Sequence, residues 1–344
     1  MSDDSLHTLS AHTTLGLGGP AAGLIEAKSI EEMVSGVQAA ARDDRPLLVL
    51  GGGSNVVIAD DGFPGTALLV RSSGFSTARA DAEHVLVRVE AGQHWDEFVA
   101  AAVEQGWSGA ECLSGIPGLA GGTPIQNVGA YGQEVSETIV SVTVYDRDEG
   151  AVQTFTNEQC RFEYRNSVFK RSQRWVVLDV TFRLRLDPLS APISYAELAK
   201  ALDVPLGQRV PLRAAREAVL EIRRRKGMVL DPSDPDTRSV GSFFTNPVLS
   251  RAAYREMAVE APAWPGAGET MKVSAAWLIE NSGFHRGYRR GAAAISSKHT
   301  LALTNPGNGT TADLLALAAE IRAGVLDRFG VTLHPEPVLV NCAL

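Results

Sequence analysis

The 344-residue chain has few cysteines and lacks the common metal-binding patterns. Its three cysteines, Cys112, Cys160 and Cys342, lie far apart and form neither a C-x-x-C pair nor a zinc spacing. The seven histidines include no pair at metal-ligand spacing. We therefore expect no metal. Because unpaired thiols are typical of a reducing compartment, we expect a cytoplasmic protein.

The sequence also lacks an excess of positive charge and a long hydrophobic run. Its 32 Lys and Arg residues and 40 Asp and Glu residues give a net charge of −8, whereas nucleic-acid binding needs a basic surface. No apolar stretch approaches the length of a membrane span. The N-terminus carries Asp3 and Asp4 and has no basic segment before an apolar run, unlike a signal peptide. We expect neither a nucleic acid nor a membrane as partner.

Several common enzyme signatures are missing as well. Residues 16–19 (Gly-Leu-Gly-Gly) lack the third glycine of a dinucleotide-binding fingerprint and follow no predicted strand. The chain contains no Walker A pattern, no H-E-x-x-H pair and no G-x-S-x-G turn. These absences disfavour the common nucleotide hydrolases, zinc proteases and α/β-hydrolases.

The composition is that of a globular protein, with 44% hydrophobic and 21% charged residues, and the length suits two or three domains. Hydrophobic periodicity predicts helices at residues 30–41, 95–106, 214–225, 274–281 and 311–329. The same analysis predicts strands at residues 47–50, 66–70, 84–90, 140–145, 152–155 and 176–186. Prolines between residues 188 and 211 indicate a domain boundary at about 205–215.

A glycine-rich segment directly follows the predicted strand at residues 47–50. Gly51, Gly52 and Gly53 allow positive φ angles and leave the backbone N–H groups bare, so the loop can form an anion nest for a diphosphate. Ser54 and Asn55 add short side chains that form hydrogen bonds. A plain turn after a strand has the same composition, so this segment alone does not separate the two interpretations.

A second glycine-rich segment, residues 115–132, is too apolar for a solvated linker and too rich in glycine for a helix. Loops of this length inside a compact domain are usually functional. Two such segments on one α/β scaffold suit a large, flat cofactor with a diphosphate, because both let the backbone come close to it. A purely structural Ω-loop is the alternative.

Four further motifs lie in order along the chain: residues 160–167 (Cys-Arg-Phe-Glu-Tyr-Arg-Asn-Ser), 241–247 (Gly-Ser-Phe-Phe-Thr-Asn-Pro), 276–280 (Ala-Trp-Leu-Ile-Glu) and 335–336 (Pro-Glu). Together with the two glycine-rich segments, they make the chain resemble the UDP-N-acetylenolpyruvoylglucosamine reductase family over nearly its whole length. The resemblance is to the longer class of these enzymes, which has a mobile loop with a tyrosine. Several motifs in order are far more specific than any one of them.

The resemblance implies an α+β fold, in which a two-subdomain FAD-binding fold of the vanillyl-alcohol-oxidase (PCMH) type precedes an α/β substrate domain. The expected parts are FAD-binding subdomain 1 at residues 1–70, subdomain 2 at 71–210, the substrate domain at 211–330, and a C-terminal strand at 331–344 that carries the catalytic glutamate. FAD is expected to bind without a covalent link. Its expected contacts are Gly51, Gly52, Gly53, Ser54, Asn55, Gly115, Ile116, Pro117, Gly118, Gly121, Gly122, Gln126, Asn127, Gly129, Ala130, Tyr131 and Gly132.

The resemblance also implies an NADPH-driven oxidoreductase of cell-wall biogenesis, and hence of cell shape and division. Hydride passes from NADPH to FAD, and from reduced FAD to the enolpyruvyl group of UDP-N-acetylglucosamine enolpyruvate. The product is UDP-N-acetylmuramate, a peptidoglycan precursor. Hydride addition at the β-carbon leaves negative charge on the carboxylate, which needs positive or donor groups, and the α-carbon then needs a proton.

Arg165, Ser242 and Glu336 match the catalytic positions of the family. Arg165 would stabilise the negative charge, because a guanidinium suits a carboxylate. Ser242 would deliver the proton and Glu336 would hold the second face of the site, with Glu336 as proton donor the alternative. Taken singly, they also suit a solvated charge, a capping residue and a loop charge, respectively. Their placement inside three matching motifs favours catalysis.

Three further residues match the substrate side of the family. Tyr195 resembles the tyrosine of the mobile loop, although a core aromatic of a hairpin is the alternative. Lys226 closes a basic run at residues 223–226 that suits a diphosphate, whereas such runs are more often a solvated helix face. Asn246 would also bind the substrate.

Two other functions stay open at this point. One is an FAD-dependent sugar or alcohol oxidase on the same scaffold, and the other is a non-catalytic protein that binds a UDP-sugar. Ser54 and Asn55 follow the first glycines where many such oxidases carry a histidine or cysteine linked to the flavin, which disfavours the oxidase. Retention of all three catalytic matches disfavours the non-catalytic protein. We expect a monomer.

Overall fold

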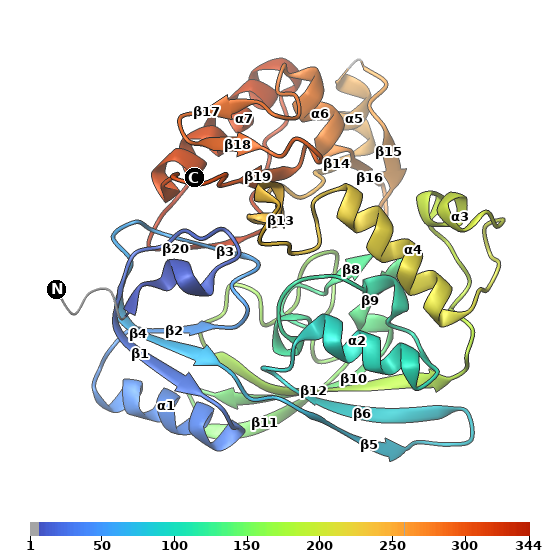
Figure 1. Ribbon diagram of the computed structural model, residues 1–344. Helices are drawn as coiled ribbons and strands as arrows, with labels where there is room; N and C mark the ends of the chain where they lie inside the picture. The colour runs from blue at the N-terminus through green and yellow to red at the C-terminus, as the bar shows by residue number, and fades with distance from the viewer. Residues whose placement is uncertain (1–6, 258) are drawn as a thin grey trace. The chain divides into compact units, whose positions relative to one another are not determined.

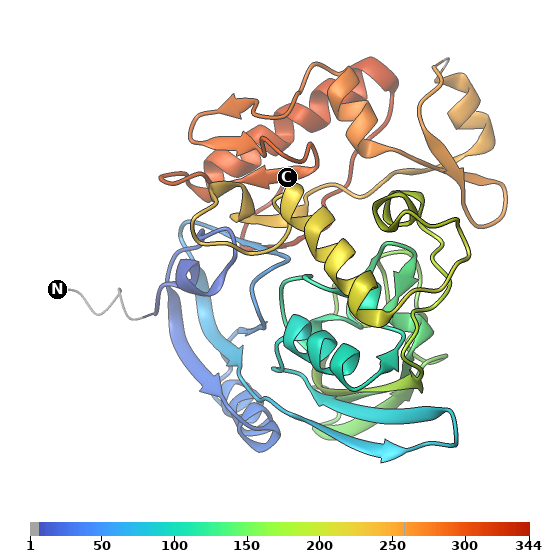
Figure 2. The same ribbon diagram turned by 45° about the vertical axis from the view of Figure 1, so that its right-hand side comes forward.

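The computed structural model describes residues 7–257 and 259–344, and the chain forms two compact units (Figure 1, Figure 2). The glycine-loop unit comprises Ala21–Gly53 and Pro64–Val229, and the C-terminal unit comprises Met1–Pro20, Ser54–Phe63 and Leu230–Leu344. Each unit therefore combines segments that are distant in the sequence. The four-part division expected from the sequence stays a prediction.

The first part of the glycine-loop unit is a small α/β layer, in which the first glycine segment directly follows strand β2 (Leu47–Leu50). Its elements are β1 (Ala21–Ala27), α1 (Ile30–Arg42), β2 (Leu47–Leu50) and β4 (Phe63–Val70). The strand order is β1-β4-β2, with β2 and β4 parallel, and α1 lies against this sheet in Figure 1. The hydroxyl of Ser29 accepts a hydrogen bond from the Glu32 N–H at 3.1 Å and caps α1. The predicted helix and strands of this region are confirmed.

An antiparallel sheet forms the larger part of the glycine-loop unit. Its strands are β5 (Phe75–Arg79), β6 (His84–Glu90), β7 (Trp107–Ser108), β10 (Ile139–Asp146), β11 (Ala151–Thr156) and β12 (Trp175–Leu186). The order is β11-β10-β12-β6-β5, and β7 also pairs with β12. β10 and β11 form the hairpin that the sequence predicts. The long strand β12 is the centre on which the other strands assemble.

A cluster of aromatic rings fixes helix α2 (Trp95–Glu104) on this sheet. Phe98 stacks on Phe182 of β12 with ring centroids 5.4 Å apart, and Trp95 packs against both rings at 5.6 and 5.7 Å. All three rings are fully buried. The Trp95 indole N–H donates to the Leu113 carbonyl at 3.1 Å. The core therefore holds the backbone just before the second glycine segment in place.

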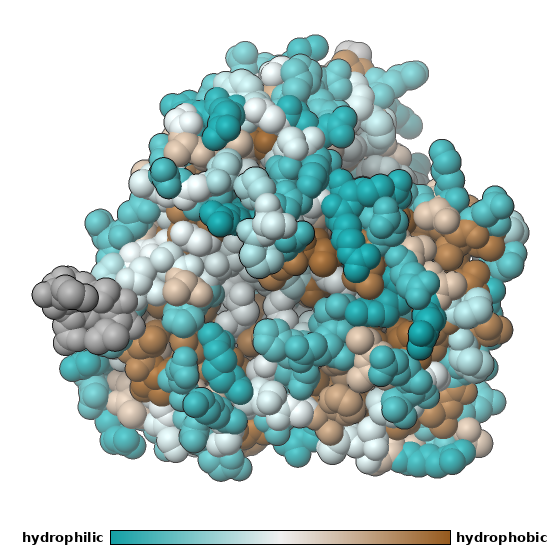
Figure 3. Space-filling view, viewed as in Figure 1, coloured by the Kyte–Doolittle hydropathy of each residue, from teal (hydrophilic) through white to brown (hydrophobic). Residues whose placement is uncertain are grey.

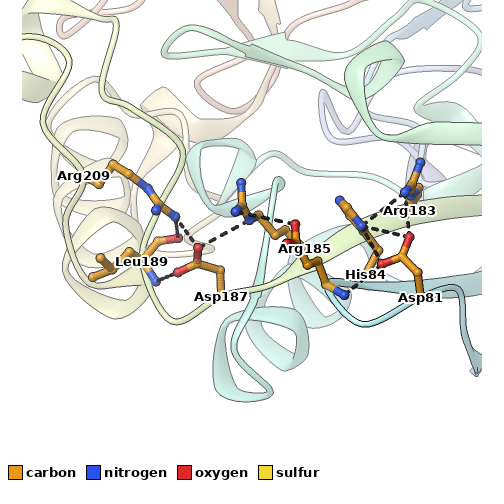
Figure 4. A network of polar contacts seen from close by, with 8 residues as sticks. Asp81, His84, Arg183, Arg185, Asp187, Leu189 and Arg209 are labelled. Atoms are coloured by element: carbon orange, nitrogen blue, oxygen red, sulfur yellow. Dashed lines mark hydrogen bonds and ion pairs between the residues drawn. The ribbon is translucent and has the colours of Figure 1, made fainter.

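The chain leaves the sheet after β12 and makes an excursion, residues 188–211, here called the tyrosine loop. It contains helix α3 (Ala196–Leu202), and helix α4 (Leu212–Arg225) begins at its end. Asp187 accepts hydrogen bonds from the Arg209 guanidinium at 2.6 Å and the Leu189 N–H at 2.9 Å (Figure 4). The Arg209 hydrogen bond lowers the pKa of Asp187, which keeps the pair charged. This ion pair closes the base of the tyrosine loop.

The described residues of the C-terminal unit form two larger sheets and one pair of strands. Its strands are β3 (Val56–Ile58), β13 (Ser239–Ser242), β14 (Val248–Ser250), β15 (Ala263–Pro265), β16 (Thr270–Val273), β17 (Arg289–Arg290), β18 (Ala293–Ile295), β19 (Ala302–Thr304) and β20 (Val338–Val340). Its helices are α5 (Arg251–Glu256), α6 (Ala275–Asn281) and α7 (Thr311–Phe329). The sheets have the orders β13-β19-β18-β17 and β14-β16-β15, and α7 packs on the first (Figure 1).

Helix α7 and the short strand β20 complete the C-terminal unit. A capping box between Thr310 and Asp313 begins α7, and Gly330 ends it with a φ of +66°. The helix predicted at residues 311–329 is thereby confirmed. β20 begins only after Pro335 and Pro337, because proline has no N–H for a strand ladder. Glu336 therefore precedes the strand, which pairs in parallel with β3. Among the helices of residues 7–257 and 259–344, none combines the length and hydropathy needed to span a bilayer.

Removing the Phe98 ring tests how much the aromatic cluster contributes to stability. Phe98→Ala should lower the free energy of unfolding by about 3–5 kcal/mol, because it leaves a cavity in a close-packed core. Urea denaturation followed by circular dichroism measures the change. Val152→Ala on β11, where the side chain is 56% exposed, is the control and should change stability by less than about 0.5 kcal/mol. Equal losses in both variants would contradict this core.

Candidate active site

The two glycine-rich segments meet in the glycine-loop unit. A Cβ placed on Gly52 would lie 2.8 Å from the Gly118 Cα, so no side chain fits between these backbones. Gly53 and Gly118 have φ angles of +62° and +114°, which favour glycine. The Gly51 carbonyl accepts a hydrogen bond from the Arg71 guanidinium at 3.3 Å. The two glycine-rich segments therefore pack against each other at Gly52 and Gly118.

Backbone hydrogen bonds fasten the first half of the second segment beside α2. The Gly118 carbonyl accepts from the Trp95 N–H at 3.1 Å, and the Gly121 N–H donates to the Ala91 carbonyl at 2.9 Å. A Cβ on Gly121 would lie 2.6 Å from the Ala91 Cβ, so this glycine permits a close approach. Gly122 differs, because it is exposed and has open space around its Cα. Nothing in the structure requires a glycine at that position.

A charged fork holds the start of the same segment. The Gly115 N–H donates to the Asp96 carboxylate at 2.6 Å, and Arg216 of α4 donates to both oxygens of that carboxylate at 2.6 and 2.9 Å. Burial opposes ionisation of Asp96, but the bonds from Arg216 and Gly115 outweigh it and lower the pKa. Asp96 therefore stays charged and joins α2, α4 and the glycine segment.

The motif at residues 160–167 braces the second half of the segment. The Ser167 hydroxyl donates to the Ile125 carbonyl at 2.7 Å, and the Asn127 amide donates to the Glu163 carbonyl at 3.1 Å. Asn127 also donates to the Glu134 carboxylate at 2.8 Å. The carboxamide of Asn127 therefore orders the loop itself. These bonds explain why the two motifs occur together.

Arg165 lies on the glycine segment rather than in solvent. Its guanidinium donates to the carbonyls of Gly129 at 2.5 Å and Asn127 at 3.3 Å, and it lies 3.8 Å from the Glu134 carboxylate. Only 20% of its side chain is exposed, and its backbone has a φ of +54°. Such an ordered, half-buried arginine in a left-handed conformation does not fit the alternative of a freely solvated charge.

The end of the second segment contacts the tyrosine loop. A Cβ on Gly132 would lie 2.1 Å from the Ser194 hydroxyl, so the absence of a side chain there admits the loop. The Tyr131 and Tyr195 rings pack edge to face with centroids 5.4 Å apart. The Lys226 ammonium lies 5.9 Å from the Tyr131 ring centroid. The structure thus gathers three residues predicted from separate motifs. Tyr195 is 43% exposed, which excludes the alternative of a hairpin core aromatic.

The geometry of the glycine-loop unit fits a cofactor such as FAD. The two segments present bare backbone where they approach each other, and side chains of the chain itself hold them in that conformation. Backbone N–H groups in such turns bind phosphate oxygens, and the lack of Cβ atoms admits a flat ring system. Ile116, Pro117, Gln126 and Ala130 are half-buried along the same segment.

Ser242 and Glu336 lie on neighbouring backbone segments of the C-terminal unit. The Glu336 N–H donates to the Phe243 carbonyl at 2.9 Å, and Phe244 forms a backbone bridge with Pro335. Phe243 and Phe244 are fully buried and pack edge to face at 5.1 Å, which anchors the segment that carries Ser242. Two motifs from distant parts of the sequence are therefore adjacent.

Two more of the expected contacts belong to the same unit. The Val338 N–H donates to the Asn55 carbonyl at 3.0 Å, so the segment with Ser54 and Asn55 lies beside the C-terminal strand. The Asn246 side-chain oxygen accepts from the Ala275 N–H at 2.9 Å, at the start of α6. This bond orients the Asn246 amide. Sequence analysis assigned Asn246 only a ligand role and missed this structural one.

Sequence reasoning also missed the charged residues that position the site. Asp96, Arg216 and Glu197 belong to no glycine motif, and their partners are distant in the sequence. The signal that could have drawn attention to Asp96 is its place in the first turn of a helix just before the long glycine segment. Glu197 follows the motif tyrosine by two residues, which is a weaker signal.

Comparison with known proteins agrees with this geometry. Residues 231–340 match the family described as "UDP-N-acetylenolpyruvoylglucosamine reductase, C-terminal domain", and residues 21–156 match the "FAD binding domain" family. A UDP-N-acetylenolpyruvoylglucosamine reductase of Salinispora arenicola (strain CNS-205) is 61% identical, over 98% of this chain and 95% of the relative. The protein of the same name from Thermobifida fusca (strain YX) is 54% identical, over 98% and 97%.

A solved structure supports the same conclusion. The UDP-N-acetylenolpyruvylglucosamine reductase of Thermus caldophilus matches with a TM-score of 0.66 and 25% sequence identity, covering 97% of each chain. The α+β fold, the FAD cofactor and the reductase activity predicted from the motifs are confirmed, which disfavours the oxidase and the non-catalytic alternatives. The chain therefore belongs to the UDP-N-acetylenolpyruvoylglucosamine reductase family, whose FAD-dependent, NADPH-driven reduction of the enolpyruvyl group serves peptidoglycan synthesis.

Proposed function

We propose that Arg165, Ser242 and Glu336 carry the chemistry of this reduction on UDP-N-acetylglucosamine enolpyruvate. The observation that supports this most strongly is the 2.9 Å hydrogen bond from the Glu336 N–H to the Phe243 carbonyl. It makes the two proton-donor candidates neighbours although they come from distant motifs. Bound FAD supplies the hydride transfer between NADPH and the substrate.

The two glycine segments are the proposed seat of FAD. The close approach of Gly52 and Gly118 supports this, because a backbone surface without Cβ atoms can follow a diphosphate and a flat ring. The Asp96–Arg216 fork at Gly115 keeps the loop shaped before a ligand arrives. Preorganisation of this kind lowers the entropic cost of binding.

Arg165 is the proposed group that stabilises the developing carboxylate charge. Two of its N–H groups bond to the carbonyls of Gly129 and Asn127, which fixes the plane of the guanidinium. A fixed cation stabilises charge that appears in the transition state without reorganising at that moment. Ser242 is the proposed donor of the proton to the α-carbon, with Glu336 able to repolarise the serine hydroxyl or to donate itself.

Tyr195, Lys226 and Asn246 are the proposed substrate contacts. Their support is that Tyr195 and Lys226 both lie against the Tyr131 ring, one through an edge-to-face contact and the other as a cation over the ring. We also expect a monomer that acts in the cytoplasm. The unpaired state of Cys112, Cys160 and Cys342 suits a reducing compartment.

Loss of the charge on Asp96 should loosen FAD binding. Asp96→Asn keeps the shape but weakens the bonds from Gly115 and Arg216, so the dissociation constant of FAD should rise by about three- to tenfold. Fluorescence quenching of FAD by the apoprotein measures this constant. Glu97→Gln changes an exposed carboxylate in the same helical turn and should leave FAD affinity unchanged. Unchanged affinity in Asp96→Asn would remove the fork from cofactor binding.

Ser242→Ala should separate the two half-reactions. Reduction of the flavin by NADPH should keep its rate, whereas reoxidation by the enolpyruvyl substrate should slow by about 10²–10⁴-fold, because the α-carbon loses its proton donor. Stopped-flow absorbance of the flavin follows both steps. Glu336→Gln is the comparison. Normal reoxidation in Ser242→Ala together with a block in Glu336→Gln would assign the proton to Glu336 instead.

Tyr195→Phe should chiefly weaken substrate binding. Loss of one hydroxyl that bonds to the ligand should raise the dissociation constant by about three- to tenfold, with little effect on FAD content. Isothermal titration of the FAD-loaded protein with UDP-N-acetylmuramate measures it. Tyr145→Phe, whose hydroxyl contacts Gln38 on a different part of the same unit, is the control. The same affinity in both variants would reject a ligand contact for Tyr195.

A further inference from the structure

Lys226 already has an anionic partner in the glycine-loop unit. Its ammonium lies 2.6 Å from the Glu197 carboxylate. Lys226 caps the C-terminal end of α4, and Glu197 lies in the first turn of α3 within the tyrosine loop. The two side chains are 33% and 40% exposed, so the pair stands at the surface, where a ligand can reach it.

The pair belongs to a cluster of four side chains from three segments. Tyr195 precedes Glu197 by two residues and packs its ring edge to face on Tyr131. The Lys226 ammonium also contacts the Tyr131 ring and lies 5.9 Å from its centroid. We call Tyr131, Tyr195, Glu197 and Lys226 the latch cluster. Figure 3 shows brown, hydrophobic patches among teal, hydrophilic ones on the side of the molecule where α3 lies. Leu189 and Leu206 of the tyrosine loop are exposed.

Next to the latch cluster, Arg223 has a side-chain donor without an acceptor in the described part of the chain. Arg223 lies one turn before Lys226, and its Nη2 donates to the Met228 carbonyl at 2.9 Å. Its Nε is buried and has no hydrogen-bond partner among the described residues. The Asp96 carboxylate is already bonded to Arg216 and Gly115. Glu197 is therefore the carboxylate that neutralises Lys226. The Nε donor of Arg223 has no acceptor within residues 7–257 and 259–344.

A carboxylate and a phosphate present the same acceptor chemistry to an ammonium group. Glu197 competes with a diphosphate for the Lys226 ammonium, because its carboxylate occupies one of the three N–H donors and repels a second anion at the same group. We propose that Glu197 is an internal counter-ion that holds the phosphate-binding amine of Lys226 and thereby lowers the affinity for nucleoside diphosphate sugars. This inference rests on the proposed role of Lys226 as a diphosphate ligand.

The counter-ion has a consequence for selectivity. A ligand with a single negative charge replaces one ion pair at Lys226 with another, so its electrostatic gain there is offset by the loss of the Glu197 interaction. A diphosphate brings a second negative charge, which the guanidinium of Arg223, one helical turn before Lys226, also attracts. Glu197 therefore favours doubly charged ligands over singly charged ones. Tyr195 is the N-cap residue of α3, so the ion pair also joins the start of this helix to the end of α4.

Glu197→Gln tests the proposal directly. In the FAD-loaded protein, it should tighten the binding of UDP-N-acetylglucosamine by about two- to fivefold, as expected for the loss of a weak, exposed ion pair. Isothermal titration at low salt measures the affinity, and the gain should shrink as potassium chloride screens the charges. Glu221→Gln, an exposed glutamate of α4, makes the same change in net charge and should not alter the affinity.

The Lys226→Met variant tests the diphosphate role of Lys226 separately from the counter-ion role of Glu197. In its background, Glu197→Gln should give no further gain, because the interaction that it relieves is already absent. If Lys226→Met leaves the affinity unchanged, the proposed diphosphate role of Lys226 fails. If Lys226→Met weakens binding while Glu197→Gln fails to tighten it, the counter-ion proposal alone fails. Weaker binding by Glu197→Gln would assign Glu197 a structural role. FAD content and circular dichroism confirm that each variant is folded.

Discussion

The glycine-loop unit depends on the approach of two backbones that carry no Cβ where they meet. At Gly52 and Gly118 a side chain would need space that is already taken by main-chain atoms. Such a contact gains little by itself, since glycine is entropically costly to order. It persists because the surrounding structure determines it. The aromatic core fixes Trp95, which holds Gly118, and a charged fork holds Gly115. Packing in the core therefore determines the conformation of the glycine loop.

The motifs occur together because they bond to one another. The Ser167 hydroxyl and the Arg165 guanidinium donate to backbone carbonyls of the segment, and the Glu163 carbonyl accepts from the Asn127 side chain. A change in either segment would leave buried polar groups without partners, which is costly in a protein interior. The same logic joins the segments of Ser242 and Glu336 through the Phe243 carbonyl. Motifs that are far apart in the sequence therefore occur together because their residues are in contact in the folded protein.

The sequence predicts the elements whose signals are local. Ser29 and Gly330 mark helix ends, and the glycines mark both loops. Helix α3 escapes prediction because its seven residues are too few for a periodic pattern. The Asp96–Arg216 and Glu197–Lys226 pairs escape because their partners meet only after the chain has folded. The double function of Asn246 and the fit of Gly132 against Ser194 depend on tertiary contacts in the same way.

The two ion pairs of α4 differ in a way that suits two different tasks. The Asp96 carboxylate accepts two hydrogen bonds from the Arg216 guanidinium and one from the Gly115 N–H, so three donors stabilise its charge. Bidentate bonds of this kind are strong and specific in direction. Glu197 has one bond to the flexible ammonium of Lys226 at a surface that is one-third exposed. Exposed single pairs are weak and are exchanged easily for other anions. One helix therefore carries a permanent bond that shapes the glycine loop and a replaceable bond where a diphosphate would bind.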